Sequence, residues 1–166
     1  MNSDDDEEYR VKVRRCRETG NALEESWYHL NGDRGRIGAP ARLVWDPHTF
    51  NLVTEEFWSV DGLESPLSGK LPAHTQFDPV TGDPVCRVWM RYHSKHRIGD
   101  LPAVEFLRDG KPLRHEYWID GQLYRKSGPP IVNFDPATSE IVSTADALEE
   151  KLQKLPRGYF PSPSPK

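Results

Sequence analysis

The chain has 166 residues, a formal net charge of −4 and a mean hydropathy of −0.75, which fits one domain with a thin hydrophobic core. The acidic balance gives no overall reason to expect nucleic acid or anionic lipid as a partner. No apolar run approaches the roughly 18 residues that a membrane span needs.

The N-terminal segment, residues 1–8, is acidic, and we expect it to be disordered because a run of like charges buries nothing. It is the opposite of a signal peptide, so we expect a cytoplasmic protein. Residues 9–17 alternate apolar and basic side chains, which predicts a first strand. Its two faces would carry Tyr9, Val11 and Val13 on one side and Arg10, Lys12 and Arg14 on the other.

Three sequence features then recur together four times along the chain, with a period of about 30 residues. Tryptophan recurs at Trp27, Trp58, Trp89 and Trp118. Proline recurs at Pro40, Pro72, Pro102 and Pro129, and an Asp-initiated turn recurs at Asp46, Asp78, Asp109 and Asp135. Self-similarity at such a period indicates an array of identical supersecondary units.

Each unit is predicted to be a β-hairpin followed by a Gly/Pro connector. First strands are expected at residues 41–45, 73–77, 103–107 and 130–134. In three copies the turn reads Asp-Pro-x-Thr, in which proline presets φ and the aspartate bonds the backbone ahead of it. The remaining copy uses Asp109-Gly110, a common hairpin turn. We therefore predict an all-β fold, an antiparallel β-hairpin repeat array or meander of about four repeats within residues 9–143.

One short capping helix is expected at residues 144–156. Ala145, Leu148, Leu152 and Leu155 fall at helical spacing, Ser143 or Thr144 is a candidate N-cap, and Pro156 would end the helix. Such a helix would cover the last hairpin, as the end of a repeat array requires. Residues 157–166 form a Pro/Ser-rich tail that is expected to be extended.

The fourth copy carries a recognisable motif, Tyr117-Trp118-Ile119-Asp120-Gly121-Gln122-Leu123-Tyr124-Arg125, followed by Ser127-Gly128-Pro129. It resembles a bacterial and viral repeat of the form aromatic-Trp-x-Asn/Asp-Gly-x-x-His-Arg-x-x-Gly-Pro-Ala, which is similar to the membrane occupation and recognition nexus (MORN) repeats. The resemblance is closest in this copy and in half of the third. It implies a meander of hairpins and a binding or scaffolding role, and some relatives are antitoxin-like. It implies no catalytic signature.

The tryptophans are the first candidates for a binding surface. Strand alternation places Trp89 with Arg87 and Arg91, and Trp118 with Glu116, so we expect a tryptophan ladder on the more polar face of the sheet. Tryptophan and arginine are enriched at the energetic centres of interfaces. The alternative is that the tryptophans stack along the array and only bury one another.

Residues that break the repeat symmetry are better candidates. The segment 87–97 interleaves basic and aromatic side chains, as a groove for single-stranded nucleic acid or a site for an acidic protein partner would. A solvated strand balanced by neighbouring acids is the alternative. The partner-binding residues we select are Arg87, Trp89, Arg91, Tyr92, Arg97 and Trp118.

No pattern points to catalysis, a cofactor or a metal. His93 and His96 lie at a predicted bend without a third ligand. Cys86 has apolar neighbours on a strand, which favours an inert core thiol. Cys16 and Cys86 form no zinc or disulfide pattern.

We therefore expect a non-enzymatic repeat protein that binds a macromolecular partner, foremost a protein, through a broad sheet face. One alternative is an antitoxin-like or anti-defence inhibitor that uses the acidic N-terminus. The other is a nucleic-acid-binding protein that uses residues 87–97. Open sheet edges also leave room for homodimerisation.

Overall fold

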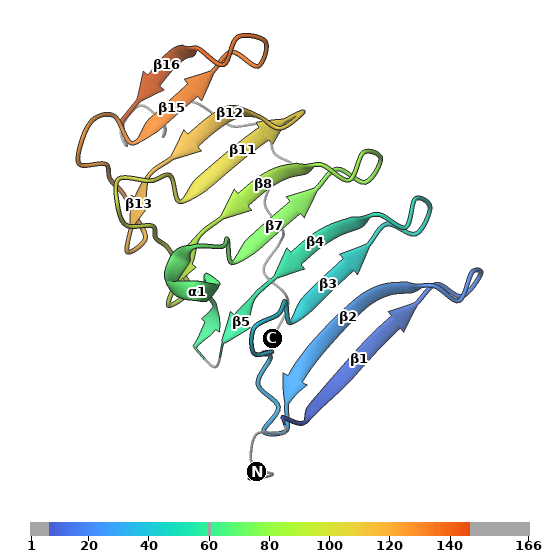
Figure 1. Ribbon diagram of the computed structural model, residues 1–166. Coiled ribbons are helices and arrows are strands. Elements are labelled where there is room, and N and C mark those ends of the chain that lie inside the picture. The colour runs from blue at the N-terminus through green and yellow to red at the C-terminus, as the bar shows by residue number, and fades with distance from the viewer. Residues whose placement is uncertain (1–6, 60, 147–166) are drawn as a thin grey trace, which may run out of the picture.

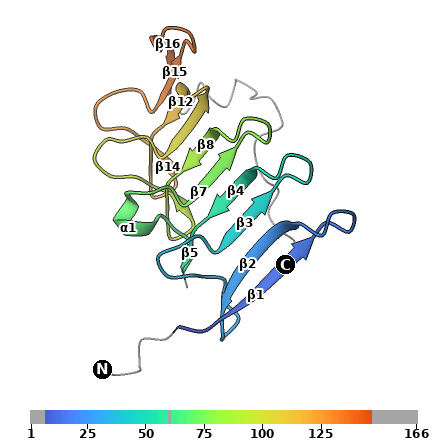
Figure 2. The ribbon, with the colours of Figure 1, turned by 45° about the vertical axis from the view of Figure 1, so that its right-hand side comes forward.

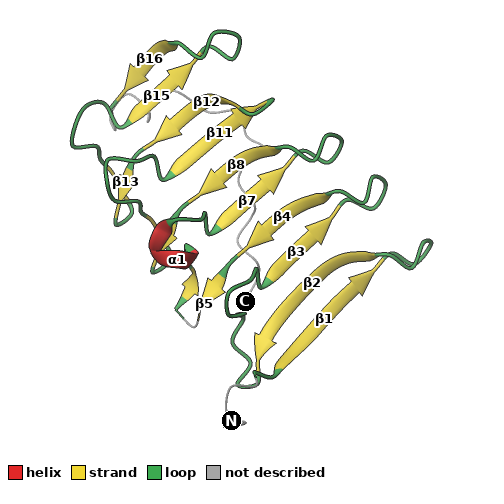
Figure 3. Cartoon of the chain, viewed as in Figure 1, coloured by secondary structure: helices red, strands yellow, loops and turns green. Residues whose placement is uncertain are grey.

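The computed structural model describes residues 7–59 and 61–146. Ten strands of this part form one antiparallel sheet in which spatial order follows chain order (Figures 1 and 3). They are β1 (Tyr9–Arg15), β2 (Ala22–His29), β3 (Arg42–Trp45), β4 (Leu52–Glu56), β7 (His74–Phe77), β8 (Pro84–Val88), β11 (Val104–Arg108), β12 (Lys111–Glu116), β15 (Ile131–Phe134) and β16 (Ile141–Ala145). The predicted all-β meander is confirmed, and the first strand pairs with β2 as a further hairpin.

Three short hairpins and one helical turn lie at one end of the long strands (Figures 1 and 2). The hairpins are β5 (Trp58–Ser59) with β6 (Gly62–Leu63), β9 (Met90–Arg91) with β10 (Ser94–Lys95), and β13 (Trp118–Ile119) with β14 (Gln122–Leu123). The helix α1 (Pro66–Gly69) belongs to the connector that leads from β6 to β7. Each connector therefore returns the chain to the main sheet on this side.

The predicted Asp-initiated turns occupy the opposite end of the sheet (Figure 1). Oδ1 of Asp46 accepts hydrogen bonds from the backbone N–H groups of His48 and Thr49, at 2.9 and 2.8 Å. Asp78 and Asp135 make the equivalent pairs of bonds. The aspartate thus satisfies two backbone donors and fixes the hairpin geometry.

Aromatic and small residues alternate across the sheet where the long strands bend into the short hairpins. The backbone N–H of Trp27 bonds the carbonyl oxygen of Ala41, and three further pairs repeat this bond at 2.8 Å: Phe57 with Ala73, Trp89 with Ala103, and Tyr117 with Pro130. The three alanines are 0% exposed. Their small side chains leave room for the rings on neighbouring strands, and this row is one core of the array.

The tryptophans do not form a single ladder. Glu56, His74 and Val88 are successive cross-strand partners and therefore share one face. Trp89 follows Val88 and projects to the other face, whereas Trp58 donates its indole N–H to Glu56 on the first face, at 2.9 Å. In the hydrogen-bond pattern above, the positions of Trp27 and Trp89 are taken in the other two repeats by Phe57 and Tyr117. The expectation that all four tryptophans lie on one face of the sheet is therefore wrong.

The end of the described chain also differs from the expectation. Ser143 and Thr144, which were predicted to cap a helix, lie in β16 and pair with β15. Residues 147–156 of the predicted helix and the tail at 157–166 lie outside the described residues, as do residues 1–6. No helix of the described part is both long and apolar enough to cross a membrane.

Candidate functional site

An arginine at the start of a connector lies over the aromatic residue at the bend of the same repeat. The distances from the guanidinium carbon to the ring centroid are 3.9 Å for Arg36 over Trp27, 3.6 Å for Arg97 over Trp89 and 3.9 Å for Arg125 over Tyr117. A cation over an aromatic face is stabilising, most of all where water is excluded. These stacks hold three of the four connectors against the sheet.

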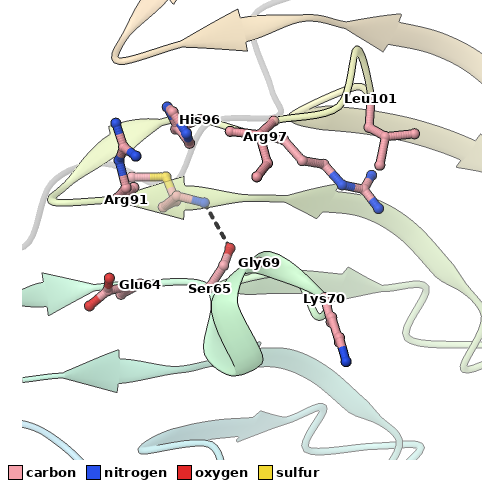
Figure 4. Close-up of a pocket in the computed structure, with 10 residues that line it drawn as sticks. Glu64, Ser65, Gly69, Lys70, Arg91, His96, Arg97 and Leu101 are labelled. Carbon is pink, nitrogen blue, oxygen red and sulfur yellow. Dashed lines mark hydrogen bonds between the residues drawn. The ribbon is translucent and has the colours of Figure 1, made fainter.

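The second repeat departs from this arrangement. The residue that follows the short-hairpin bond to Phe57 is Ser65, where the other repeats have arginine. The Ser65 hydroxyl accepts a hydrogen bond from the backbone N–H of Met90 at 2.9 Å, and its own N–H donates to the Met90 carbonyl at 3.0 Å (Figure 4). Here the connector contains the helical turn α1, and a hollow lies between this connector and the third repeat.

This hollow has a volume of about 670 Å³. Its walls come from the α1 connector, from Met90 and Arg91 on β9, and from the third connector with Ile98 and Leu101 (Figure 4). Hollows of about 330 and 240 Å³ lie between the preceding and the following pair of connectors, and each shares wall residues with the central one. We call the three together the connector groove.

The connector groove is basic although the chain is acidic. Six cationic and two acidic side chains line it: Arg36, Lys70, Arg91, Arg97, Arg125 and Lys126 against Glu64 and Asp100. Exposed aliphatic side chains stand between these charges, among them Ile37 and Ile98, which are 68% and 66% exposed. The surface therefore offers both charge and apolar area to a partner.

The turn beside the central hollow has an unusual backbone. Tyr92 and His93 have φ values of 47° and 63°, a region that glycine, asparagine and aspartate favour. The equivalent turn of the fourth repeat has Asp120 and Gly121 there. Placing Tyr92 in this conformation costs about 1–2 kcal/mol, yet its side chain is 65% exposed. Strained backbone positions of this kind cluster at functional sites.

The six residues selected from the sequence have different environments. Arg91 and Arg97 line the central hollow, and Arg97 and Trp118 line the third. Tyr92 is not a wall residue of the three hollows; it follows the wall residue Arg91 in the β9–β10 turn. Trp89 is only 4% exposed and packs beneath Arg97. Arg87 does not line the groove and pairs with Glu105 at 3.6 Å.

Two of the arginines hold the fold together as well as lining the groove. Arg97 bonds the carbonyl oxygen of Pro102 at 3.0 Å and pairs with Glu105 at 3.2 Å. Arg91 pairs with Asp120 of the next short hairpin at 2.6 Å. Among the described residues Lys70 is exposed and has no ion-pair partner. Lys70 is therefore, together with Lys126, an exposed lining cation without a described ion pair.

The groups that were considered for catalysis or metal binding have structural roles. Cys86 is buried in the core, as expected, and burial raises the pKa of its thiol to about 12. His96 is buried, and its Nδ1 accepts a hydrogen bond from the Asp120 N–H at 3.1 Å. The described residues hold no cluster of three or more side chains suited to a metal ion.

Sequence reasoning missed Lys70, Ile98 and Leu101 as wall residues. The available signal was the second connector, which contains no arginine, whereas the first and third both contain Arg-Ile-Gly. The loss of its arginine was the local sign that a hollow would open there.

Comparisons of the chain with protein-family models, with curated proteins and with solved structures give no significant match. The function is therefore argued from the geometry of the connector groove.

Proposed function

We propose that this chain is a non-enzymatic, MORN-like repeat protein that binds a protein partner in the connector groove. The observation that carries the proposal is the central hollow. It forms where the second repeat breaks the arginine–aromatic pattern, and the strained, exposed Tyr92 directly follows its wall residue Arg91 in the chain. Repetition serves packing between neighbouring units, whereas this departure from it marks a position that packing alone does not explain.

The walls favour a partner with acidic and aliphatic side chains. The excess of cations over acids in the groove attracts acidic groups and accelerates their encounter. Met90, Ile98 and Leu101 add apolar area, which supplies binding free energy to a protein segment. These apolar walls favour a protein segment over nucleic acid, whose phosphate backbone would use only the cations.

The interiors of the repeats support a binding role over a catalytic one. Glu56 and Glu116 are buried, and both accept an indole N–H from a tryptophan two residues further along the chain. Cys86 is held as a thiol by burial. These groups are occupied by packing contacts, and a reaction would need them free.

The test is capture of interacting proteins from source cells with a variant that combines Lys70→Glu and Tyr92→Ala. Both side chains are exposed, so we expect an unchanged melting temperature and loss of the captured partner. The matched control is Arg108→Glu, which makes the same charge change at an exposed position near the Asp-turn end of the sheet. It should capture the partner as the wild type does.

Capture of the same proteins by all three chains would refute the connector groove as the site. Salt-sensitive retention of single-stranded RNA or DNA by the wild type, lost in the double variant, would replace the protein partner with nucleic acid.

A further inference from the structure

The first strand of the sheet has a free edge. No described strand pairs with β1 on the side away from β2. Six of its seven residues are exposed, and the strand is regular except for one register shift between Arg14 and Arg15. Its start is held in place, because the Tyr9 hydroxyl accepts a hydrogen bond from the backbone N–H of Ile37 at 3.0 Å. The edge is therefore an ordered template for a further strand.

The bonding pattern shows which backbone groups point outward. The N–H of Trp27 bonds Ala41 of the next repeat, so the alternate residue Ser26 directs its N–H and C=O toward β1. Ser26 pairs with Lys12, whose backbone groups consequently face β2. By the same alternation, the N–H and C=O groups of Val11 and Val13 face away from the sheet and lack a described strand partner.

The side chains of this edge have an alternating character. Arg10, Lys12 and Arg14 project from one face at two-residue intervals, and Val11 and Val13, 42% and 40% exposed, project from the other. Only Arg14 has an acidic partner on β2, Glu24 at 3.3 Å. The three cations repel a second basic strand, and they would lie directly opposite the acidic side chains of an incoming strand.

We propose that β1 binds an extended segment of a partner protein as an eleventh strand, and that this segment alternates acidic and aliphatic residues. Its backbone bonds Val11 and Val13, its acidic side chains lie opposite Arg10, Lys12 and Arg14, and its aliphatic side chains lie opposite the two valines. Addition of a strand to a sheet edge is an established mode of peptide recognition. This surface is separate from the connector groove.

Charge favours such a partner over a second copy of this chain. Pairing of β1 with β1 of another copy would place cations opposite cations, which is destabilising. The other free edge, β16, exposes Ile141 and Val142 but carries no acidic side chain. Within the described residues, neither edge provides the acidic face that β1 would bind best.

The test uses a fluorescein-labelled Glu-Val-Glu-Val-Glu peptide, with Lys-Val-Lys-Val-Lys as its matched control, and fluorescence anisotropy with the full chain. We expect binding of the acidic peptide and at least tenfold weaker binding of the basic one. Lys12→Glu should weaken binding of the acidic peptide at least tenfold and strengthen binding of the basic peptide.

A second variant separates backbone pairing from charge. Val11→Pro removes an outward-facing N–H that makes no bond within the sheet, and proline is tolerated at such edge positions. It should abolish peptide binding and leave the melting temperature within a few degrees of the wild type. Lys12→Pro, which removes an inward bond of the β1–β2 ladder, should lower the melting temperature.

Three results would overturn the proposal: equal binding of both peptides, acidic-peptide binding that survives Val11→Pro, or concentration-dependent self-association that Val11→Pro abolishes. The last would assign the edge to a second copy. Lys70→Glu with Tyr92→Ala should leave peptide binding unchanged, so failure at the edge and failure at the groove are distinguishable.

Discussion

The imidazole ring of His93 fills the space into which a side chain on Gly62 would project. A Cβ atom built on Gly62 would lie 1.8 Å from Cε1 of His93. The short hairpins of the second and third repeats therefore stack closely only because residue 62 is glycine. This contact supports the strained turn that carries Tyr92, so it links packing between repeats to the proposed binding site.

Gly62→Ala should destabilise the protein more than Gly32→Ala does. Both glycines have positive φ, 108° and 97°, but nothing lies within 4 Å of a Cβ on Gly32. Backbone strain is common to both variants, and the overpacking against His93 adds about 2 kcal/mol to the first. Urea unfolding measures the difference. Adding His93→Ala to Gly62→Ala should recover most of the additional loss of stability. Equal losses of stability in Gly62→Ala and Gly32→Ala would show that the contact between residue 62 and His93 does not limit packing.

Glu56 should make stability depend on pH in the acid range. Burial alone would raise its pKa, but hydrogen bonds from His74 and Trp58 and the charge of Arg42 lower it to about 2. A lowered pKa contributes stability above the unfolded value of 4.5, and this contribution, on the order of 3 kcal/mol, is lost as the pH falls toward 2. Glu56→Gln should be less stable at pH 7.

Unfolding free energies measured from pH 5 to pH 2 check this expectation. Glu56→Gln should flatten the slope between pH 4.5 and 2, and Trp58→Phe, which removes one donor to the carboxylate, should give an intermediate slope. A slope for Glu56→Gln equal to that of the wild type would show that other groups determine the acid sensitivity.

The main hairpins could be predicted from the sequence because their signals are local. Asp46, Asp78 and Asp135 bond the backbone two and three residues ahead, so each turn is encoded within a few positions. Local signals of this kind could not predict on which face of the sheet each tryptophan lies. A shift of one residue reverses the side of a strand, and Phe57-Trp58 and Tyr117-Trp118 place aromatic residues at both positions.

The candidate site was only partly predictable. Residues 87–97 depart from the repeat pattern in sequence, and this departure pointed to Arg91, Tyr92 and Arg97. The hollow itself depends on how connectors of neighbouring repeats meet in space, which no local pattern encodes. Ser65 shows this best, because its bonds to Met90 join positions 25 residues apart in the chain.

Cys16 and Cys86 should react differently with a thiol reagent. Cys16 occupies the turn position that Asp46 holds in the next hairpin, and its N–H bonds the carbonyl oxygen of Asn21 as that of Asp46 bonds Asn51. Hydrogen bonds from the Thr19 side chain and backbone lower the pKa of Cys16, whereas burial raises that of Cys86 to about 12. Iodoacetamide at pH 8 followed by peptide mass mapping should label Cys16 alone. Labelling of both in the folded protein would contradict the burial of Cys86.

Phe50→Gly should stabilise the protein. Phe50 has φ of 61° in its turn, where the equivalent positions of two other turns hold Gly20 and Gly82 at 74° and 78°. Glycine removes a strain of about 1 kcal/mol, and Phe50 is 47% exposed, so we expect the packing lost with its ring to be smaller than this gain. Thermal unfolding should show a higher melting temperature for Phe50→Gly and a lower one for Gly82→Ala. A decrease in both would show that the Phe50 ring contributes more than its exposure suggests.

Arg97 and Lys70 line the same hollow, but a substitution that keeps the charge should lower stability at Arg97 and leave it unchanged at Lys70. Arg97→Lys loses the planar group that lies over Trp89 and pairs with Glu105, at a cost of about 1–2 kcal/mol. Lys70→Arg should leave stability unchanged, because Lys70 has no described partner to lose. Urea unfolding of both variants measures this contrast. Equal stability of Arg97→Lys and the wild type would mean that the ring stack does not hold the third connector, and the central hollow would then lack its rigid wall.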